Sequence, residues 1–252
     1  MSAGTRASVA LVDYGAGNLL SIGQALAVLG ADVRVVRRAG EIGSPDLVVV
    51  PGVSAPGPAM RRLRRAGLDR ALAAAVEGGA WYLGICLGMQ LLFGRSEEDG
   101  SGGLAWIAGE TCRLPSAPRL PHIGWNQLDV VTPHRMLAGL PPRPPMYFVH
   151  SFAPVPHDPG VIVAETVHGG RFASAVASGR LLGLQFHPEK SGADGLRVLR
   201  NVLELVARSA AGAEQDGDGA GVEWDRDGAC AGRVVPARGA VRGPGPASRG
   251  AA

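Results

Sequence analysis

A short apolar run leads directly into a glycine-flanked cysteine in the stretch Trp81-Tyr82-Leu83-Gly84-Ile85-Cys86-Leu87-Gly88-Met89-Gln90. The pattern predicts a buried strand over 81–85 and a buried helix over 87–93. Glycines on both sides of Cys86 allow a sharp turn that presents its side chain at the carboxyl edge of a sheet. A helix that begins after Cys86 would also favour the thiolate, because unpaired N–H groups carry partial positive charge. The alternative is a structural cysteine buried between packing glycines.

Strand and helix patterns alternate along the rest of the first half of the chain, which is typical of βαβ units. From Ile123 onward the patterns are mostly strand-like, until a last helix that carries one apolar stripe. We therefore predict an α/β fold with a central, mostly parallel sheet and additional antiparallel β-structure. The predicted strands cover 9–13, 33–36, 47–50, 81–85, 123–131, 146–152, 161–167, 172–177 and 181–186, and the predicted helices cover 19–29, 59–65, 87–93 and 192–208.

The composition excludes several classes of protein. With 252 residues, of which 46% are hydrophobic, the chain can bury a sizeable core. A net charge of +3 is too small to indicate a nucleic-acid partner, and no apolar run is long enough to span a membrane. Cys86, Cys112 and Cys230 suit neither a disulfide framework nor a zinc site. We expect a cytoplasmic protein without a metal or cofactor, and we interpret the arginine-rich run 61–65 as a solvated face.

The two ends of the chain differ from its body. Residues 1–8 form a polar extension, and the apolar segment 9–12 that follows is too brief for the core of a signal peptide. Residues 211–252 contain ten glycines and ten alanines but no Leu, Ile, Phe or Met, so they cannot bury enough apolar surface to offset the entropy of ordering. We predict one domain over 9–208 and a disordered Gly/Ala/Arg-rich tail over 209–252, which is either a solvated extension or a partner-binding arm.

A second motif supplies what a reactive thiol requires. His187-Pro188-Glu189 follows the predicted strand 181–186. A thiol nucleophile needs an imidazole that takes and returns its proton, and the imidazole needs a carboxylate that holds its orientation. His187 and Glu189 suit these two roles. An isolated histidine near a strand end is often structural, so it is the combination with Cys86 that indicates catalysis.

The two motifs resemble those of class I glutamine amidotransferases, in which a Cys-His-Glu triad hydrolyses the side-chain amide of glutamine on a flavodoxin-like, three-layer α/β fold. The resemblance covers about residues 9–208. Many related amidotransferases have His at the position of Met89. In this respect the chain resembles the glutaminase subunits of imidazole glycerol phosphate synthase. Further similar stretches are Asp13-Tyr14-Gly15-Ala16-Gly17-Asn18, Pro51-Gly52-Val53, Cys86-Leu87-Gly88-Met89-Gln90, Pro121-His122-Ile123-Gly124-Trp125-Asn126 and Tyr147-Phe148-Val149-His150-Ser151.

The resemblance implies a role for each matching residue. Cys86 attacks the γ-carboxamide of L-glutamine, ammonia leaves, and water hydrolyses the thioester to glutamate, while His187, oriented by Glu189, transfers the protons. Backbone N–H groups of Leu87 and of the 51–53 segment stabilise the oxyanion, and Glu98 suits the α-ammonium group. The implied substrate-binding residues are Gly52, Val53, Leu87, Gln90, Glu98, His150, Ser151 and Phe152.

The resemblance also implies a partner. Ammonia passes to a cyclase subunit in a heterodimer, and this (β/α)₈ barrel converts N'-phosphoribulosyl-formimino-AICAR-phosphate to imidazole glycerol phosphate and AICAR in histidine biosynthesis. Lys190 is the single lysine among 25 basic residues, and it directly follows the triad glutamate. We interpret it as a compact charge on the docking face. The implied partner-facing residues are Asn18, Trp125, Asn126, Tyr147 and Lys190.

The segment 13–18 also matches part of a dinucleotide-binding loop. The third glycine of that motif would fall at Leu20, so a helix and a strand could not approach each other as such a site requires. We predict instead a turn in which Asn18 caps the following helix.

Two positions depart from the family pattern. Ser54 stands where the family usually has glycine, and Pro56 stands where it has Phe. In the family this strand is thought to rearrange to complete the oxyanion hole, and serine adopts a positive φ less readily than glycine. A catalytically silent binding module of the same fold therefore remains an alternative. The other alternative is the glutaminase subunit of an aminodeoxychorismate or pyridoxal phosphate pathway enzyme.

Overall fold

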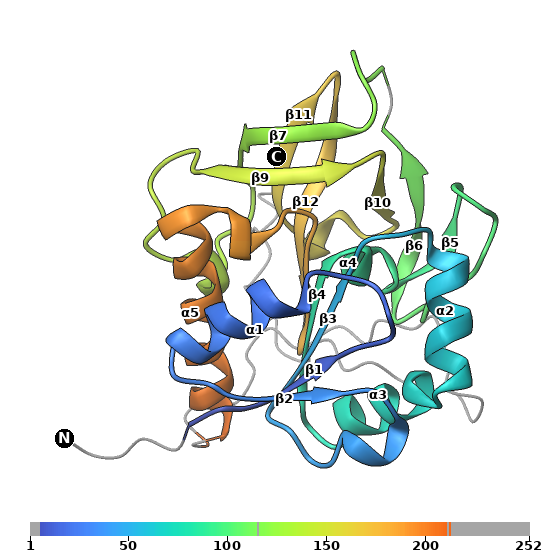
Figure 1. The fold of residues 1–252 in the computed structure, drawn as a ribbon. Coiled ribbons are helices and arrows are strands. Elements are labelled where there is room, and N and C mark those ends of the chain that lie inside the picture. Colours follow the sequence, from blue (N-terminus) through green and yellow to red (C-terminus); the bar gives the residue numbers. More distant parts are fainter. Residues whose placement is uncertain (1–5, 115, 211, 213–252) are drawn as a thin grey trace, which may run out of the picture.

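The computed structural model describes residues 6–114, 116–210 and 212, and its largest element is an eight-stranded sheet (Figure 1). Five strands run parallel to one another, and β12, β11 and β8 continue the sheet in antiparallel pairing. In spatial order the strands are β2 (Asp32–Val36), β1 (Ser8–Val12), β3 (Leu47–Gly52), β4 (Trp81–Cys86), β13 (Leu181–Leu184), β12 (Gly170–Ser178), β11 (Ile162–His168) and β8 (Asp129–Val130).

Helices cover both faces of this sheet. The helices α1 (Leu19–Val28) and α5 (Gly192–Ala210) lie on one face, and α2 (Pro56–Arg65) and α3 (Leu68–Glu77) lie on the other (Figure 1). Successive side chains of the central strands point to opposite faces of the sheet, so they belong to two separate apolar clusters. Val9 and Leu11 pack with the α1 and α5 side, whereas Ala10 and Val12 pack with the α2 and α3 side. The predicted α/β fold with a mostly parallel central sheet is confirmed.

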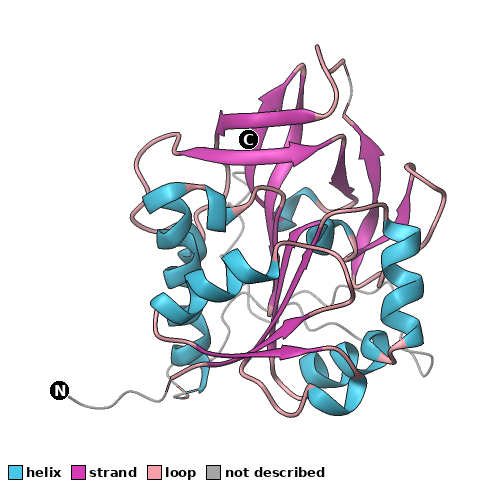
Figure 2. Ribbon diagram, viewed as in Figure 1, coloured by secondary structure: helices cyan, strands magenta, loops and turns pink. Residues whose placement is uncertain are grey.

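Two smaller sheets complete the β-structure of the described residues (Figure 2). The strands β10 (Phe152–Pro156), β6 (Ile107–Arg113) and β5 (Phe93–Ser96) form one of them, and β7 (His122–Gln127) pairs antiparallel with β9 (Pro145–His150) in the other. The β7–β9 ribbon lies over the carboxyl edge of the main sheet. There the Tyr147 carbonyl accepts a hydrogen bond from the His187 N–H at 2.9 Å. The described residues also form short 3₁₀ turns, namely η1 (Ala39–Glu41), η2 (Arg135–Leu137), η3 (Pro159–Val161) and η4 (Pro188–Lys190).

The structure corrects the predicted helix over 87–93. Only one turn forms, α4 (Leu87–Gln90), and the chain then enters β5. The carbonyl groups of Leu91 and Leu92 accept hydrogen bonds from the N–H groups of Leu104 and Ile107 at 2.7 and 2.9 Å, so they cannot continue a helix. A single turn aligns few peptide dipoles, and the electrostatic help that it can give to a thiolate is correspondingly small.

Other element boundaries also differ from the prediction. The expected strand over 146–152 is two strands, β9 and β10, which separate at Ser151 because β10 pairs with β6 in another sheet. The expected strand over 123–131 divides into β7 and β8 in the same way. The elements α3, β5 and β6 were not predicted.

The ends of the predicted domain stay a prediction. The strand β1 begins at Ser8, and α5 continues to Ala210. Apart from 209, 210 and 212, the residues of the predicted tail over 209–252 lie outside the described residues, as does Cys230. Within the described ranges, no helix combines the length and the apolar character that crossing a membrane would require.

Candidate active site

Cys86 is the last residue of β4 and stands at a strained turn. Its φ of 54° and ψ of −107° are unusual for a residue with a side chain, and only 5% of its surface is exposed. The two flanking glycines make this turn possible. A Cβ atom on Gly88 would collide with the Val50 carbonyl oxygen, and one on Gly84 would collide with the Gly88 carbonyl group. The predicted sharp turn is therefore the conformation that this segment adopts.

The sheet brings Cys86 and His187 to the same edge. The strands β4 and β13 are parallel neighbours, with Ile85 opposite Leu184, and Cys86 and His187 follow at their carboxyl ends. His187 is held from its backbone, since its N–H donates to the Tyr147 carbonyl at 2.9 Å and its carbonyl accepts from the Ser191 hydroxyl at 2.7 Å. The imidazole is thus fixed by the fold as well as by its side-chain partner.

Glu189 contacts the Nδ1 atom of this imidazole. Its Oε1 lies 2.9 Å from Nδ1 of His187, and the two side chains are only 3% and 4% exposed. Burial lowers the pKa of His187, but Cys86 and Glu189 raise it more, and the outcome is a pKa of about 9. His187 is consequently an imidazolium near pH 7, beside the Cys86 sulfur. Within the described part of the chain, Nε2 of His187 has no hydrogen-bond partner, so this nitrogen is available for proton transfer.

Two glutamines connect the cysteine to the predicted substrate segment. Nε2 of Gln90 donates to the Phe152 carbonyl at 2.9 Å and to Oε1 of Gln185 at 3.2 Å. Nε2 of Gln185 in turn lies 3.6 Å from the Cys86 sulfur. Gln185 is fully buried and was not among the predicted site residues, although it stands two positions before His187. Its residue type and its place at a strand end could have indicated a role.

The predicted oxyanion segment lies against Cys86. Gly52 is opposite Cys86 in the register of β3 and β4. A Cβ atom on Gly52 would collide with the Tyr14 hydroxyl and would lie 2.9 Å from Cβ of Leu87, so only glycine fits. Val53 follows and is half exposed, at 51%. Ser54 has no positive φ in this conformation, and Pro56 is the first residue of α2, where proline is well tolerated.

Tyr14 was not predicted as a site residue. Its side chain is buried, and within the described ranges its hydroxyl has no hydrogen-bond partner. Burial and the proximity of Cys86 raise the pKa of this hydroxyl, so it stays protonated. A protonated, unpaired hydroxyl over Gly52 is an unusual feature of this segment.

The remaining predicted substrate residues occupy different environments. The carbonyl groups of Ser151 and Phe152 face protein donors, namely the N–H of Leu114 at 3.0 Å for Ser151 and Gln90 for Phe152. His150 is buried, and its Nδ1 lies 2.9 Å from the Phe152 carbonyl. Glu98 lies on the exposed turn after β5, where partial burial and the neighbouring Asp99 raise its pKa.

The predicted docking face combines two exposed residues, Trp125 and Lys190, with three partly buried ones. Trp125 on β7 is 58% exposed, and its ring lies 6.0 Å from that of Tyr147 on β9. Nζ of Lys190 lies 5.8 Å from the Tyr147 ring, which is within cation–π range. Asn126 is partly buried on the same strand as Trp125. Oδ1 of Asn18 accepts from the Ser21 N–H at 3.3 Å, so the predicted cap of α1 is confirmed.

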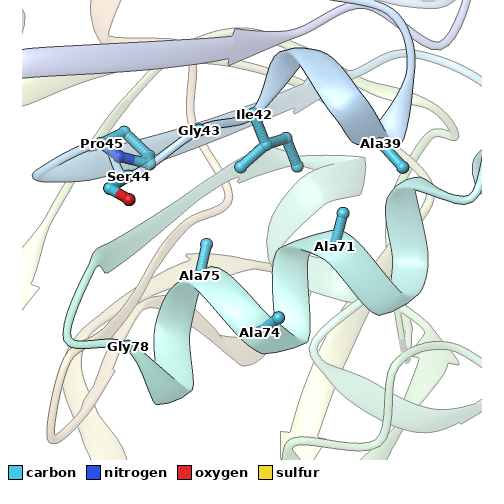
Figure 3. A pocket seen from close by; sticks show the side chains of 9 residues that line it. All are labelled: Ala39, Ile42, Gly43, Ser44, Pro45, Ala71, Ala74, Ala75 and Gly78. Atoms are coloured by element: carbon cyan, nitrogen blue, oxygen red, sulfur yellow. The ribbon is translucent and has the colours of Figure 1, made fainter.

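A separate cavity lies away from Cys86, His187 and Glu189. It has a volume of about 280 Å³ and lies between α3 and the turn after β2 (Figure 3). No acidic, basic or cysteine side chain lines it, so it offers no chemistry comparable to that at Cys86. Its lining residues are Ala39, Ile42, Gly43, Ser44, Pro45, Ala71, Ala74, Ala75 and Gly78.

The fold and the site together define a class of protein. The family model described as glutamine amidotransferase class-I matches residues 10–205, so the chain belongs to the class I glutamine amidotransferases. Within this class it is similar to proteins named imidazole glycerol phosphate synthase subunit HisH. That of Moorella thermoacetica is 46% identical over 199 residues, which cover 79% of this chain and 95% of that protein. That of Halobacterium salinarum is 45% identical over 210 residues, which cover 80% and 94%. The chain thus belongs to the HisH family.

Solved structures agree on the fold. A structure described as PurLQS from Thermotoga maritima has a TM-score of 0.64 and 21% identity, covering 80% of this chain and 100% of that chain. A glutamine amidotransferase from Thermotoga maritima has a TM-score of 0.60 and 16% identity, covering 80% and 98%. At these identities the likeness supports the amidotransferase fold alone.

Proposed function

We propose that this chain is the glutaminase subunit of imidazole glycerol phosphate synthase and that Cys86, His187 and Glu189 are its catalytic residues. The observation that carries the proposal is the buried pairing of His187 with Glu189 at the sheet edge where Cys86 stands in a strained turn. The raised pKa keeps His187 positively charged near pH 7, and a positive charge beside a cysteine sulfur stabilises the negative charge that a sulfur nucleophile carries.

The reaction would follow from the roles of these three side chains. The Cys86 sulfur attacks the side-chain amide carbon of L-glutamine, and the resulting tetrahedral intermediate collapses when His187 gives its proton to the leaving nitrogen. Ammonia departs and a thioester remains. His187, now neutral, removes a proton from water, which attacks the thioester carbon and releases glutamate and the thiol. Glutamine and water are thereby converted to glutamate and ammonia.

Transition-state stabilisation would come from backbone donors next to the cysteine. Leu87 directly follows Cys86, and Gly52 lies opposite it, which supports the proposal that their segments would border the developing oxyanion. Loss of one such donor usually lowers turnover by about 10²–10³-fold. Gln90 and the 150–152 segment would line the bound glutamine, and Glu98 would pair with its α-ammonium group.

The ammonia would pass to a cyclase subunit. The relatives named HisH are subunits of a synthase, and the β7–β9 ribbon carries the exposed Trp125 and the partly buried Tyr147 next to the active-site edge. We propose that the docking face of Asn18, Trp125, Asn126, Tyr147 and Lys190 binds that cyclase, which makes imidazole glycerol phosphate and AICAR. A cytoplasmic location fits a reaction that requires a reduced cysteine thiol.

The test measures glutamate release by the full chain in complex with the cyclase subunit of its own organism and an analogue of the cyclase substrate. Wild-type protein should release glutamate, and Cys86→Ala should release none. Cys112→Ala is the matched control, because Cys112 lies on β6 outside the triad, and it should keep the wild-type rate. Absence of release by the wild-type complex would favour a silent binding module. Release only with another synthase component would favour a different amidotransferase.

A further inference from the structure

A line of polar side chains runs from β7 to the backbone of the predicted glutamine site. Nδ2 of Asn126 lies 3.2 Å from Nε2 of His122, and Nδ1 of His122 lies 3.2 Å from Nε2 of His150. Nδ1 of His150 then lies 2.9 Å from the Phe152 carbonyl oxygen. Both imidazoles are buried, with 4% and 6% of their surfaces exposed. Three consecutive contacts therefore join the ribbon surface to Phe152.

The groups at the two ends of this line determine which atom is the donor and which the acceptor in each hydrogen bond. The Phe152 carbonyl can only accept, so His150 must carry its proton on Nδ1 and leave Nε2 as an acceptor. His122 must then donate from Nδ1, which leaves its own Nε2 as an acceptor facing Asn126. Asn126 can donate there because its amide orientation is fixed independently. Its Nδ2 also donates to the Val167 carbonyl at 2.9 Å, and its Oδ1 accepts from the Gln127 N–H at 2.8 Å.

The surroundings keep both rings neutral. Burial lowers the pKa of His150 to about 3 and the pKa of His122 to about 4, so each ring carries a single N–H near pH 7. The His122 ring also stacks on two neighbours, with centroids 4.0 Å from His168 and 5.0 Å from Phe148. Within the described residues, no group of three or more His, Cys, Asp or Glu is arranged to hold a metal ion. Ring position and ring orientation are therefore both constrained.

The far end of the line meets the side chains next to Cys86. The Phe152 carbonyl accepts from His150 and from Nε2 of Gln90 at the same 2.9 Å distance. Gln90 also donates to Gln185, whose Nε2 lies 3.6 Å from the Cys86 sulfur. The carbonyl is thus the junction between the histidine line and the glutamine pair.

We propose that Asn126, His122 and His150 are positioning residues whose one-way chain of hydrogen bonds holds the Phe152 carbonyl and, through it, Gln90 in the glutamine-binding site. The functional part rests on the proposed function, whereas the proton positions do not. Because Asn126 lies on β7 in the proposed docking face, a bound partner would act directly on the first link of this chain. The line is distinct from the triad, since none of its three residues is proposed to contact the reacting atoms.

The proton positions can be measured in the full chain without any assay of activity. Long-range ¹H–¹⁵N correlation spectra of histidine-labelled wild-type protein at pH 7 should show His122 and His150 as neutral rings protonated on Nδ1. A proton on Nε2 of either ring, or a charged ring, would overturn the proposal. This measurement needs no variant, so misfolding cannot obscure it.

The positioning role is tested by a pair of substitutions at one site. His150→Asn keeps a donor near the place of Nδ1, whereas His150→Leu removes it. Titration calorimetry in the Cys86→Ala background measures the dissociation constant for L-glutamine. His150→Leu should weaken binding about tenfold, the effect of losing one hydrogen bond to a buried carbonyl, while His150→Asn should largely restore it. His157→Leu, at an exposed histidine, is the control and should bind as the background does.

The outcomes separate this proposal from the proposed function. Equal glutamine affinity in the Leu and Asn variants overturns the positioning role even if the wild-type complex releases glutamate. Conversely, the expected proton positions and affinity difference would support the positioning role even if glutamate release failed. In the active complex, His150→Leu should raise the KM for glutamine more than it lowers kcat, because the line does not reach the proton-transfer atoms.

Discussion

Replacing Glu189 by glutamine would remove one negative charge from beside the buried imidazole and keep an oxygen that can accept the Nδ1–H bond. The bond that changes character is the 2.9 Å contact between His187 Nδ1 and Glu189 Oε1. The pKa of His187 is raised from 6.5 to about 9 in the folded protein. That difference is worth about 3 kcal/mol in favour of the imidazolium. Cys86 shares this effect with Glu189, so the substitution should remove only part of it.

The expected size of the change follows from the charge that is lost. An opposite charge in contact changes a pKa by about 1–3, so His187 in Glu189→Gln should titrate between about pH 6 and 8. NMR titration of the His187 ring in the full chain measures this directly. Glu204→Gln, at an exposed position on α5, is the control and should leave the titration near pH 9. If His187 titrated at the same pH in the wild type and in Glu189→Gln, the carboxylate would not be what stabilises the imidazolium.

The same pKa makes stability depend on pH. Because the folded-state pKa of His187 is above its unfolded value, the folded protein binds the proton more tightly. The resulting stabilisation is complete below about pH 6.5 and is lost as the pH rises towards about 9. Urea unfolding should show this loss, of up to about 3 kcal/mol, in the wild type and a smaller loss in Glu189→Gln. A wild-type stability that rose over this range would contradict the assignment.

Two further results are expected from the buried groups around the site. The pKa values of His122 and His150 are lowered by burial, so acid should destabilise the fold from about pH 6.5 downwards, because these histidines bind protons more readily in the unfolded chain than in the folded one. Urea unfolding at pH values between 7 and 4 measures this loss of stability. A free energy of unfolding that stayed constant over this range would contradict the expectation. Gly52→Ala should cost about 1–3 kcal/mol, because the new methyl group meets the Tyr14 hydroxyl and Leu87. Adding Tyr14→Phe should recover part of that loss in urea unfolding, and strictly additive effects would show that the hydroxyl is not the obstacle.

Local patterns were sufficient to predict the most specific parts of the fold. The sharp turn at Cys86 depends on glycines within two residues of it, and the sequence contains both. The cap at Asn18 similarly depends on a residue three positions away. Parallel pairing of neighbouring strands then placed His187 at the same sheet edge as Cys86, which the two motifs together had suggested.

Long-range contacts explain what the sequence did not predict. The apolar residues 87–93 have the composition of a helix, but the distant segment 104–107 binds the carbonyls of Leu91 and Leu92 and ends it. The contacts of Gln185 and the His122–His150 line likewise join strands that are far apart in the sequence. A pattern read along one chain segment carries no information on such pairings, because each residue is acceptable in several environments.

A covalent label gives the most direct test that glutamine is processed at Cys86. A glutamine analogue with an electrophilic carbon at the side-chain amide position should alkylate the full chain with a stoichiometry of one. Peptide mass spectrometry should locate the adduct on Cys86, and excess L-glutamine should prevent it. Modification of Cys112 instead, or labelling of Cys86 that glutamine does not slow, would contradict a glutamine site built around this cysteine.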